Sequence, residues 1–433
     1  MPRKKKNSVA QASSTQSNPP CLHVGIDWAD AEHAYAMRDP NGKLHRGTFK
    51  QTPEAIAAII DNWEKLFPGA SIVVCIETKR GALINALLEY QQLQIIPVNP
   101  NQLASYRKSF KHGGGKSDLV DALLILQFLE NYRTELRPLQ QDSDITRELA
   151  LLTHNRRELV NQRVNLSQQL IDVLKCYFPL ILLLNPAKIY ADWVVAMVIK
   201  WPTLQQLQAA RAHTIRTFLH GRGAKKNIEQ RIELIKAAKP LSREEVLLRT
   251  SSLRTKAMCQ QLAVLNSAII DYQRKIKALL RQHANYRIVK SLPCGDISRA
   301  RILAALGDDR SRYQSACQLA TATGIAPLTE QSGKQRFVHS RWACSHFLRQ
   351  TFHEFAKVSV SRCDWAKAYY KLQIERGKSA QMAHRALAFK WIRIIFRCWQ
   401  SGQPYVQEQY VAQLVKTNSP LVKRLTSAES MTT

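Results

Sequence analysis

Short apolar runs alternate with amphipathic segments over the first third of the chain. Unbroken apolar runs predict buried strands, and apolar residues recurring every three or four positions predict helices. These patterns place strands at 22–27, 33–38, 43–49, 71–76 and 94–98, and helices at 53–66, 81–90 and 119–132. The second and third strands flank Asp-Pro-Asn-Gly, whose Asn-Gly is a strong hairpin signal. Residues 21–143 are therefore predicted to form an α/β domain with a mixed sheet.

The pattern changes to long helices from about residue 144. One apolar series recurs every seven residues, at Leu152, Leu159, Leu166 and Val173. A second series alternates steps of four and three, at Met258, Leu262, Leu265, Ile269, Tyr272, Ile276 and Leu279. Such steps are typical of coiled coils, so residues 144–285 are predicted to hold a coiled-coil hairpin or a dimer contact. A helical insertion is expected near 180–255.

The rest of the chain is predicted to be mostly helical. A C-terminal domain is expected over 286–403, with a loop at 324–333 and a tail at 404–433. The first 20 residues are polar and basic, which predicts a disordered arm. Within the C-terminal domain, the segment SLPCGDIS at 291–298 is expected to form a sharp turn before a helix at 299–306.

Charge points to a polyanionic partner. The 433 residues have a formal net charge of +30, and 45% of them are hydrophobic, which excludes a wholly disordered chain. No apolar run reaches the roughly 18 residues that a membrane-spanning helix needs, so no membrane partner is expected. Nine cysteines without a CxxC pair fit a reduced, cytoplasmic protein. Nucleic acid is the polyanion that such an excess of charge favours.

Four carboxylates stand where α/β domains bind ligands. Asp27 ends the first predicted strand and Glu77 follows the fourth, while Asp118 and Asp121 share one face at the start of a helix. Converging acids repel one another unless a cation lies between them, and Mg²⁺ or Mn²⁺ suits such oxygen ligands. Each acid alone is as readily a turn former, a helix cap or an ion-pair partner. Together the four match the plan of a ribonuclease H-like nuclease.

The blocks VGIDWA, IET and KSDLVDA, followed by a long helical region and a Ser-Gly segment, resemble the DEDD-type insertion-sequence transposases of the IS110 family. The resemblance covers residues 22–130 and 286–402. It implies a RuvC-like domain whose metal ligands are Asp27, Glu77, Asp118 and Asp121, with Lys116 where the family commonly has a lysine. These transposases are related to the Piv DNA invertases and are recognised as bridge-RNA-guided recombinases.

The same resemblance assigns a nucleophile. In the family, a serine at the Ser-Gly position forms a transient phosphoserine with DNA, which implies this role for Ser332. A hydroxyl beside glycine is easily approached, although Gln-Ser-Gly is also an ordinary polar turn. Ser340 and Ser345 are nearby alternatives. The implied active site is composite, with the serine meeting the metal-binding acids of the same or another protomer.

Basic residues surround that serine. Residues 331–433 contain 17 Lys and Arg against five Asp and Glu. Arginine and lysine contact phosphates and stabilise phosphoryl charge. The predicted nucleic-acid contacts are Lys116, Lys334, Arg336, Arg341 and Arg349. Aromatic residues interleaved with these charges are expected to lie mostly in the core, and some to stack on unpaired bases.

The favoured interpretation is a DNA transposase of a bacterial insertion sequence. It predicts donor and target DNA, a bridge RNA, a homo-oligomer (dimer or tetramer) and a cytoplasmic, nucleoid-associated location. One alternative is a RuvC-like structure-specific nuclease that uses the four acids alone, and another is a Piv-like invertase without an RNA guide. The last is a nucleic-acid-binding protein whose acids are vestigial.

Overall fold

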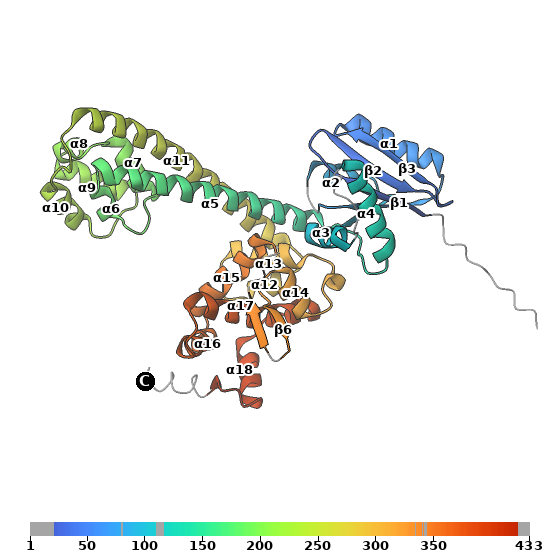
Figure 1. The fold of residues 1–433 in the computed structure, drawn as a ribbon. Coiled ribbons are helices and arrows are strands. Elements are labelled where there is room, and N and C mark those ends of the chain that lie inside the picture. The colour runs from blue at the N-terminus through green and yellow to red at the C-terminus, as the bar shows by residue number, and fades with distance from the viewer. Residues whose placement is uncertain are drawn as a thin grey trace, which may run out of the picture. The chain divides into compact units, whose positions relative to one another are not determined.

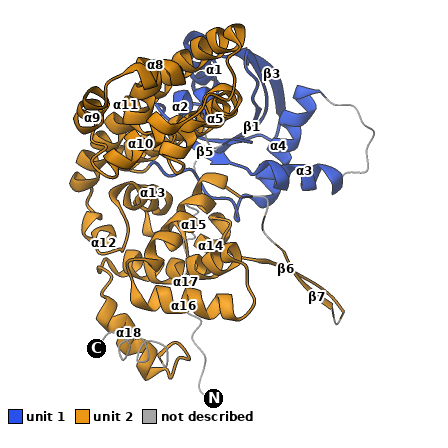
Figure 2. Cartoon of the chain, turned by 90° about the vertical axis from the view of Figure 1, so that its left-hand side faces the viewer, with its two compact units in different colours: residues 1–141 blue, residues 142–433 orange. Residues whose placement is uncertain are grey.

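The computed structural model describes residues 21–78, 81–109, 117–333, 335–339, 341 and 344–422. The chain forms two compact units, residues 1–141 and residues 142–433, coloured separately in Figure 2. None of the described helices is long and apolar enough to cross a membrane.

Unit 1 is built on a five-stranded mixed sheet (Figure 1). Its strands are β1 (Cys21–Asp27), β2 (Glu32–Arg38), β3 (Leu44–Lys50), β4 (Ser71–Ile76) and β5 (Leu93–Pro97), in the order β3-β2-β1-β4-β5. The first three strands are antiparallel, and β4 and β5 run parallel to β1. The predicted hairpin and mixed sheet are confirmed.

Helices cover both faces of this sheet. They are α1 (Pro53–Leu66), α2 (Ala82–Leu87), α3 (Pro100–Ser109) and α4 (Asp118–Tyr132). Ile60 and Trp63 of α1 pack with Val24 and Val74 on one face, whereas Ile125 of α4 packs with the other face. Because successive strand residues point to opposite faces, the unbroken apolar runs of β1 and β4 supply both layers of the core. The second helix is shorter than the predicted 81–90.

Unit 2 contains a hairpin of two long helices, α5 (Asp144–Tyr177) and α11 (Glu245–Gln282), which pack side by side (Figure 1). Five short helices between them share a core with the long helices, to which α5 contributes Leu170 and Leu174 and α11 contributes Leu262. They are α6 (Leu180–Leu184), α7 (Asp192–Lys200), α8 (Leu204–Ala209), α9 (Ala212–Gly221) and α10 (Ile228–Ala237).

The apolar series of α11 packs within the chain. Met258, Leu262, Ile269 and Ile276 are buried in the single chain. The helices α5 and α11 therefore pack on each other within one chain, while Leu265, Tyr272 and Leu279 of the same series stay half-buried.

The buried stripe of α5 differs from the predicted series. Its buried residues are Thr146, Leu149, Thr153, Ser167, Leu170, Leu174 and Tyr177, in steps of three and four on both sides of a central gap. The predicted leucines, such as Leu152 and Leu159, lie beside this stripe and are half-buried. Arg156 and Arg163 occupy stripe positions within the gap.

The remaining helices of unit 2 enclose an aromatic core. They are α12 (Tyr286–Lys290), α13 (Asp296–Leu306), α14 (Ala316–Ala322), α15 (His346–Val360), α16 (Asp364–Glu375), α17 (Ala380–Ser401) and α18 (Gln407–Lys416). Phe352, Trp365, Trp391 and Trp399 are fully buried there, which confirms that these aromatic residues are structural. The predicted turn at 291–298 separates α12 from α13.

A two-stranded hairpin interrupts these helices. It consists of β6 (Leu328–Ser332) and β7 (Gln335–His339) and extends away from the helices of unit 2 (Figure 2). The expectation of a loop over 324–333 is wrong for its second half. All five residues of β6 are exposed, so the strand has no apolar face that would reveal it in the sequence.

Candidate active site

The sheet brings two of the predicted acids together. β1 and β4 are neighbouring parallel strands, and Ile26 is aligned with Ile76. Asp27 is the last residue of β1, and Glu77 directly follows β4. The two half-buried carboxylates therefore lie at the same edge of the sheet, as predicted.

Helix α4 supplies the other two acids at its first turn. The Ser117 hydroxyl caps the helix by accepting a hydrogen bond from the Val120 N–H. Asp118 is exposed, whereas Asp121 is buried with 8% of its surface exposed. Both acids lie on one face of α4, but Asp121 lies one turn further into the helix, where its carboxylate contacts Arg107.

Gly25 permits this close approach of α4 to β1. A Cβ atom built on Gly25 would lie 2.5 Å from the Ala122 carbonyl oxygen and would also overlap the Leu126 backbone. Only glycine therefore fits the strand where the helix crosses it. The glycine two residues before Asp27 thus has a positional role that the sequence alone did not reveal.

The electrostatics of Asp27 show that the four acids converge. The pKa of Asp27 is raised to about 6, first by burial and then by the nearby carboxylates of Asp121, Asp118 and Glu77. The positive charge of Arg107 acts in the opposite direction. A carboxyl group in this environment is poised to change its protonation state or to bind a cation.

Arg107 is the functional residue that sequence reasoning missed. It lies in the last turn of α3, and its guanidinium donates a hydrogen bond to the Asp121 carboxylate. That bond raises the pKa of Arg107, and the charges of Asp27 and Glu77 add to the effect. The only sequence signal was a pair of basic residues, Arg107 and Lys108, shortly before the DxxD segment.

The described acids are close enough to influence one another but are not gathered into a metal cage. Among the residues that the structure describes, no group of three or more His, Cys, Asp or Glu side chains is arranged to hold a metal ion. Carboxylate oxygens are nevertheless the ligands that Mg²⁺ and Mn²⁺ prefer. The donor set therefore fits a divalent cation chemically.

Ser332 lies in unit 2, at the end of β6. It is exposed and pairs with Gln335 across the hairpin turn, where Gly333 adopts a φ of 58°. The turn presents the serine to solvent on a two-residue connection. Of the alternatives, Ser345 caps α15 by accepting a hydrogen bond from the Leu348 N–H, and Ser340 lies outside the described residues.

Two of the predicted basic contacts are described near this hairpin. Arg349 donates hydrogen bonds to the Arg341 carbonyl at 3.2 Å and to His346 Nδ1 at 2.7 Å. Lys116 and Lys334, like the side chain of Arg336, lie outside the described residues.

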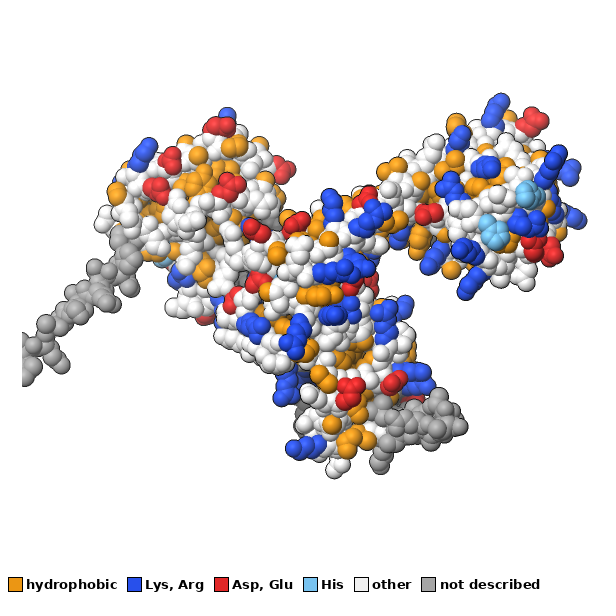
Figure 3. Space-filling view, turned by 180° about the vertical axis from the view of Figure 1, so that it is seen from behind, with side chains coloured by type: hydrophobic (Ala, Val, Ile, Leu, Met, Phe, Trp, Pro, Cys, Tyr) orange, Lys and Arg blue, Asp and Glu red, His pale blue; other side chains and the backbone are white. Residues whose placement is uncertain are grey.

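Positive charge is concentrated in unit 2. Residues 142–433 contain 46 Lys and Arg against 20 Asp and Glu, which is +26 of the total charge of +30. Figure 3 shows these basic side chains distributed over the visible face of the helical unit. Such a surface attracts the phosphate backbone of nucleic acids without regard to sequence.

Comparison with known proteins gives matches to both parts of the chain. Residues 24–179, which hold all four acids, match the DEDD domain of IS110-type transposases. Residues 286–371, which hold Ser332, match the transposase domain of the IS116/IS110/IS902 family.

Relatives extend over nearly the whole chain. The mini-circle putative transposase for IS117 from Streptomyces coelicolor is 26% identical over 91% of this chain and 98% of its own length. An uncharacterized insertion-element protein of IS116 from Streptomyces clavuligerus is 26% identical over 87% of this chain and 94% of its own length. One of IS900 from Mycobacterium paratuberculosis is 24% identical over 86% of this chain and 94% of its own length. Because both transposase domains are matched and the relatives cover most of the chain, the chain belongs to the IS116/IS110/IS902 family of DNA transposases.

Proposed function

We propose that the protein cuts and rejoins DNA strands with a divalent metal held by Asp27, Glu77, Asp118 and Asp121 and with Ser332 as nucleophile. The observation that carries the proposal is the convergence of three other carboxylates and Arg107 on Asp27 within a DEDD transposase domain. A ribonuclease H-like domain of this kind suits phosphodiester chemistry. Bound Mg²⁺ would stabilise the negative charge that develops on the phosphate.

The serine step exchanges one ester bond for another. The Ser332 oxygen attacks a backbone phosphorus, the bond from phosphorus to the leaving strand breaks, and that strand departs with a free hydroxyl group. The proton that the serine loses as it attacks ends on the oxygen of the leaving strand. Attack by the hydroxyl of a second strand on the phosphoserine then restores a phosphodiester, and the proton of that hydroxyl passes to the serine, so no other cofactor is consumed.

We further propose that a noncoding bridge RNA from the same element guides the reaction, in a homo-oligomer located with the bacterial nucleoid. The net positive charge of unit 2 supports binding to nucleic acid, because a polyanion relieves the repulsion among its basic side chains. Base pairing would then choose the sequence, and the protein would contact backbone and helix shape. We also propose that α5 and α11 pack as a coiled coil.

A denaturing gel tests the serine step. Purified protein, labelled element-end DNA, flanking RNA of the element and Mg²⁺ are expected to yield a covalent protein–DNA adduct that is lost in Ser332→Ala and in Asp27→Asn. Ser345→Ala is the matched control and is expected to retain the adduct. DNA cleavage that survives Ser332→Ala without any adduct would instead favour the nuclease alternative.

Mixing the two inactive variants tests where the active site is assembled. If one protomer supplies the acids and another the serine, mixed Asp27→Asn and Ser332→Ala proteins are expected to recover adduct formation in part. Recovery would also establish the oligomer. Its absence, with each variant active when mixed with wild type, would assign both functions to one chain.

A further inference from the structure

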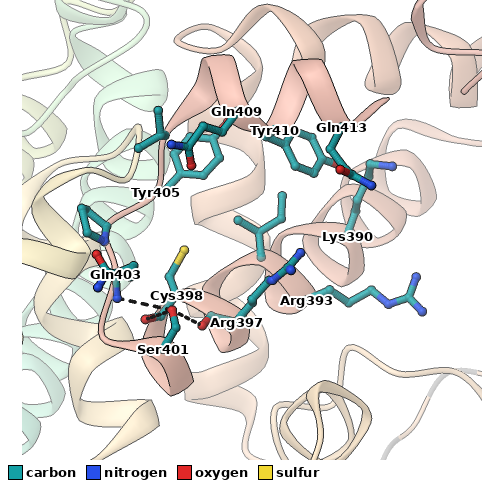
Figure 4. Close-up of a pocket in the computed structure, with 13 residues that line it drawn as sticks. Lys390, Arg393, Arg397, Cys398, Ser401, Gln403, Tyr405, Gln409, Tyr410 and Gln413 are labelled. Atoms are coloured by element: carbon teal, nitrogen blue, oxygen red, sulfur yellow. Dashed lines mark hydrogen bonds between the residues drawn. The ribbon is translucent and has the colours of Figure 1, made fainter. Parts of the chain in front are cut away.

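A cavity of about 670 Å³ lies in unit 2 between the second half of α17 and helix α18. It falls outside both matched ranges, 24–179 and 286–371. Figure 4 shows α17 contributing one wall, and α18 with the segment leading to it contributing the other. Its size is typical of pockets that hold a nucleotide-sized ligand.

The α17 wall is basic. Lys390, Arg393 and Arg397 line the cavity at steps of three and four, so they share one face of the helix. Arg393 and Arg397 are exposed, whereas Lys390 is half-buried, with its ammonium group 5.1 Å from the centre of the Tyr369 ring. None of the 13 lining residues is acidic, and none of the ion pairs formed among the described residues involves these three cations.

The opposite wall offers aromatic and amide groups. Tyr405 and Tyr410 reach toward the cavity from that side, and Gln409 and Gln413 stand four residues apart on α18 (Figure 4). Tyr410 is fixed in place by Trp365, whose ring centre is 4.7 Å away. Amide side chains both donate and accept hydrogen bonds, as the edges of nucleobases require.

We propose that this α17–α18 cavity binds a nucleotide of single-stranded DNA, with its phosphates on Arg393 and Arg397 and its base against Tyr410. The inference rests on the proposed function, because strand cleavage and exchange produce unpaired DNA. Cations without acidic partners on one wall and an aromatic ring on the other are the two features by which proteins hold single strands. A paired base inside a duplex cannot enter a cavity of this kind.

Fluorescence anisotropy of a labelled twelve-nucleotide thymidine oligonucleotide tests the proposal in EDTA, where cleavage does not contribute. The Arg393→Ala/Arg397→Ala double variant is expected to bind at least tenfold more weakly and to show a slope of log affinity against log salt that is lower by about 1.4, since each single-strand phosphate contact contributes about 0.7. Tyr410→Ala is expected to weaken binding roughly fivefold or more, and Tyr410→Phe to retain it, because stacking needs only the ring.

Lys367→Ala/Lys371→Ala is the matched control. These two lysines are also exposed and four residues apart, on α16, and they remove the same charge without lining the cavity. The proposal is overturned if both double variants lose affinity equally, if duplex DNA or an RNA oligonucleotide of the same length binds more tightly, or if free thymidine monophosphate competes as well as the oligonucleotide. Adduct formation by Asp27 and Ser332 is a separate measurement, so failure of either proposal is recognised independently.

Discussion

Arg107 donates a hydrogen bond to the carboxylate of Asp121 and thereby places a fixed positive charge among four acids. The same guanidinium lowers the pKa of Asp27, against the three carboxylates that raise it. Arg107 thus supplies, within the protein alone, part of the charge compensation that a divalent cation would provide. A cation that binds there has to overcome repulsion by Arg107.

Substitution of this arginine is therefore expected to strengthen metal binding. Arg107→Gln keeps hydrogen-bonding capacity but removes the charge, so Mg²⁺ affinity measured by calorimetry should rise roughly fivefold or more, as expected for one charge at a few ångströms in a partly screened site. Lys108→Gln, one residue further along α3, is the control and should change affinity little. Weaker binding in Arg107→Gln would mean that the arginine orients the acids rather than competing with the cation.

The crossing of α4 over β1 yields a second prediction. Gly25→Ala introduces a Cβ atom into the backbone of α4, where no side chain can yield, so unit 1 should lose about 1–3 kcal/mol of stability. Hydrogen exchange of β1 and α4 peptides should report the loss. Gly221→Ala is the control, because a Cβ atom there meets nothing within 4 Å. Equal protection in the two variants would show that α4 is less tightly packed on β1 than the structure indicates.

Much of this site was predictable from sequence, for a definite reason. Asp27 and Glu77 follow unbroken apolar runs, and neighbouring parallel strands end at one edge, so their proximity follows from topology. Arg107 could not be found in this way, because its contact with Asp121 joins two helices through their packing. The prediction for α5 was wrong because its stripe includes the polar residues Thr153, Arg156 and Ser167. A search for apolar periodicity instead selects the leucines that lie beside this stripe.

His283 leads to a prediction about pH. It is buried, its Nδ1 accepts a hydrogen bond from the Asn285 N–H at 3.0 Å, and its Nε2 lies 2.8 Å from the Thr146 hydroxyl. That hydroxyl donates to the Asp308 carboxylate at 2.8 Å. Since Nδ1 is an acceptor, the ring is neutral and Nε2 is the donor. Burial lowers the pKa of His283 below 6.5, despite the opposing charges of Asp308 and Asp142.

The sign of the pH effect follows from this shift. As pH falls through 6.5, His283 binds a proton in the unfolded chain but stays neutral in the folded protein. The contribution of His283 to the free energy of unfolding is therefore present above pH 6.5 and is lost below it. The melting temperature should fall between pH 7.5 and 5.5, and His283→Gln should reduce that fall. His213→Gln, at an exposed position of α9, should leave it unchanged. An identical pH profile for His283→Gln and wild type would contradict the assignment.

Glu354 of α15 supplies negative charge to a group of arginines that lies near the centre of the α5 stripe. Its carboxylate accepts hydrogen bonds from Arg301 at 2.6 Å and Arg157 at 3.3 Å. Arg156 lies close enough that its pKa is lowered, first by burial and then by its arginine neighbours. Glu354 also acts on Arg156, so removing its carboxylate leaves several partly buried positive charges with less compensation.

Glu354→Gln should therefore destabilise unit 2 by about 1–3 kcal/mol, less than for a fully buried pair because the carboxylate is partly exposed. Glu229→Gln is the matched control, since Glu229 pairs with Arg216 at 2.7 Å on the surface, where solvent screens the pair, and should cost less stability than Glu354→Gln. Urea unfolding of both variants measures the difference. Added sulfate should restore Glu354→Gln more than Glu229→Gln, because an anion can replace the missing carboxylate among the arginines. If sulfate restores both equally, general screening rather than the arginine group accounts for the loss.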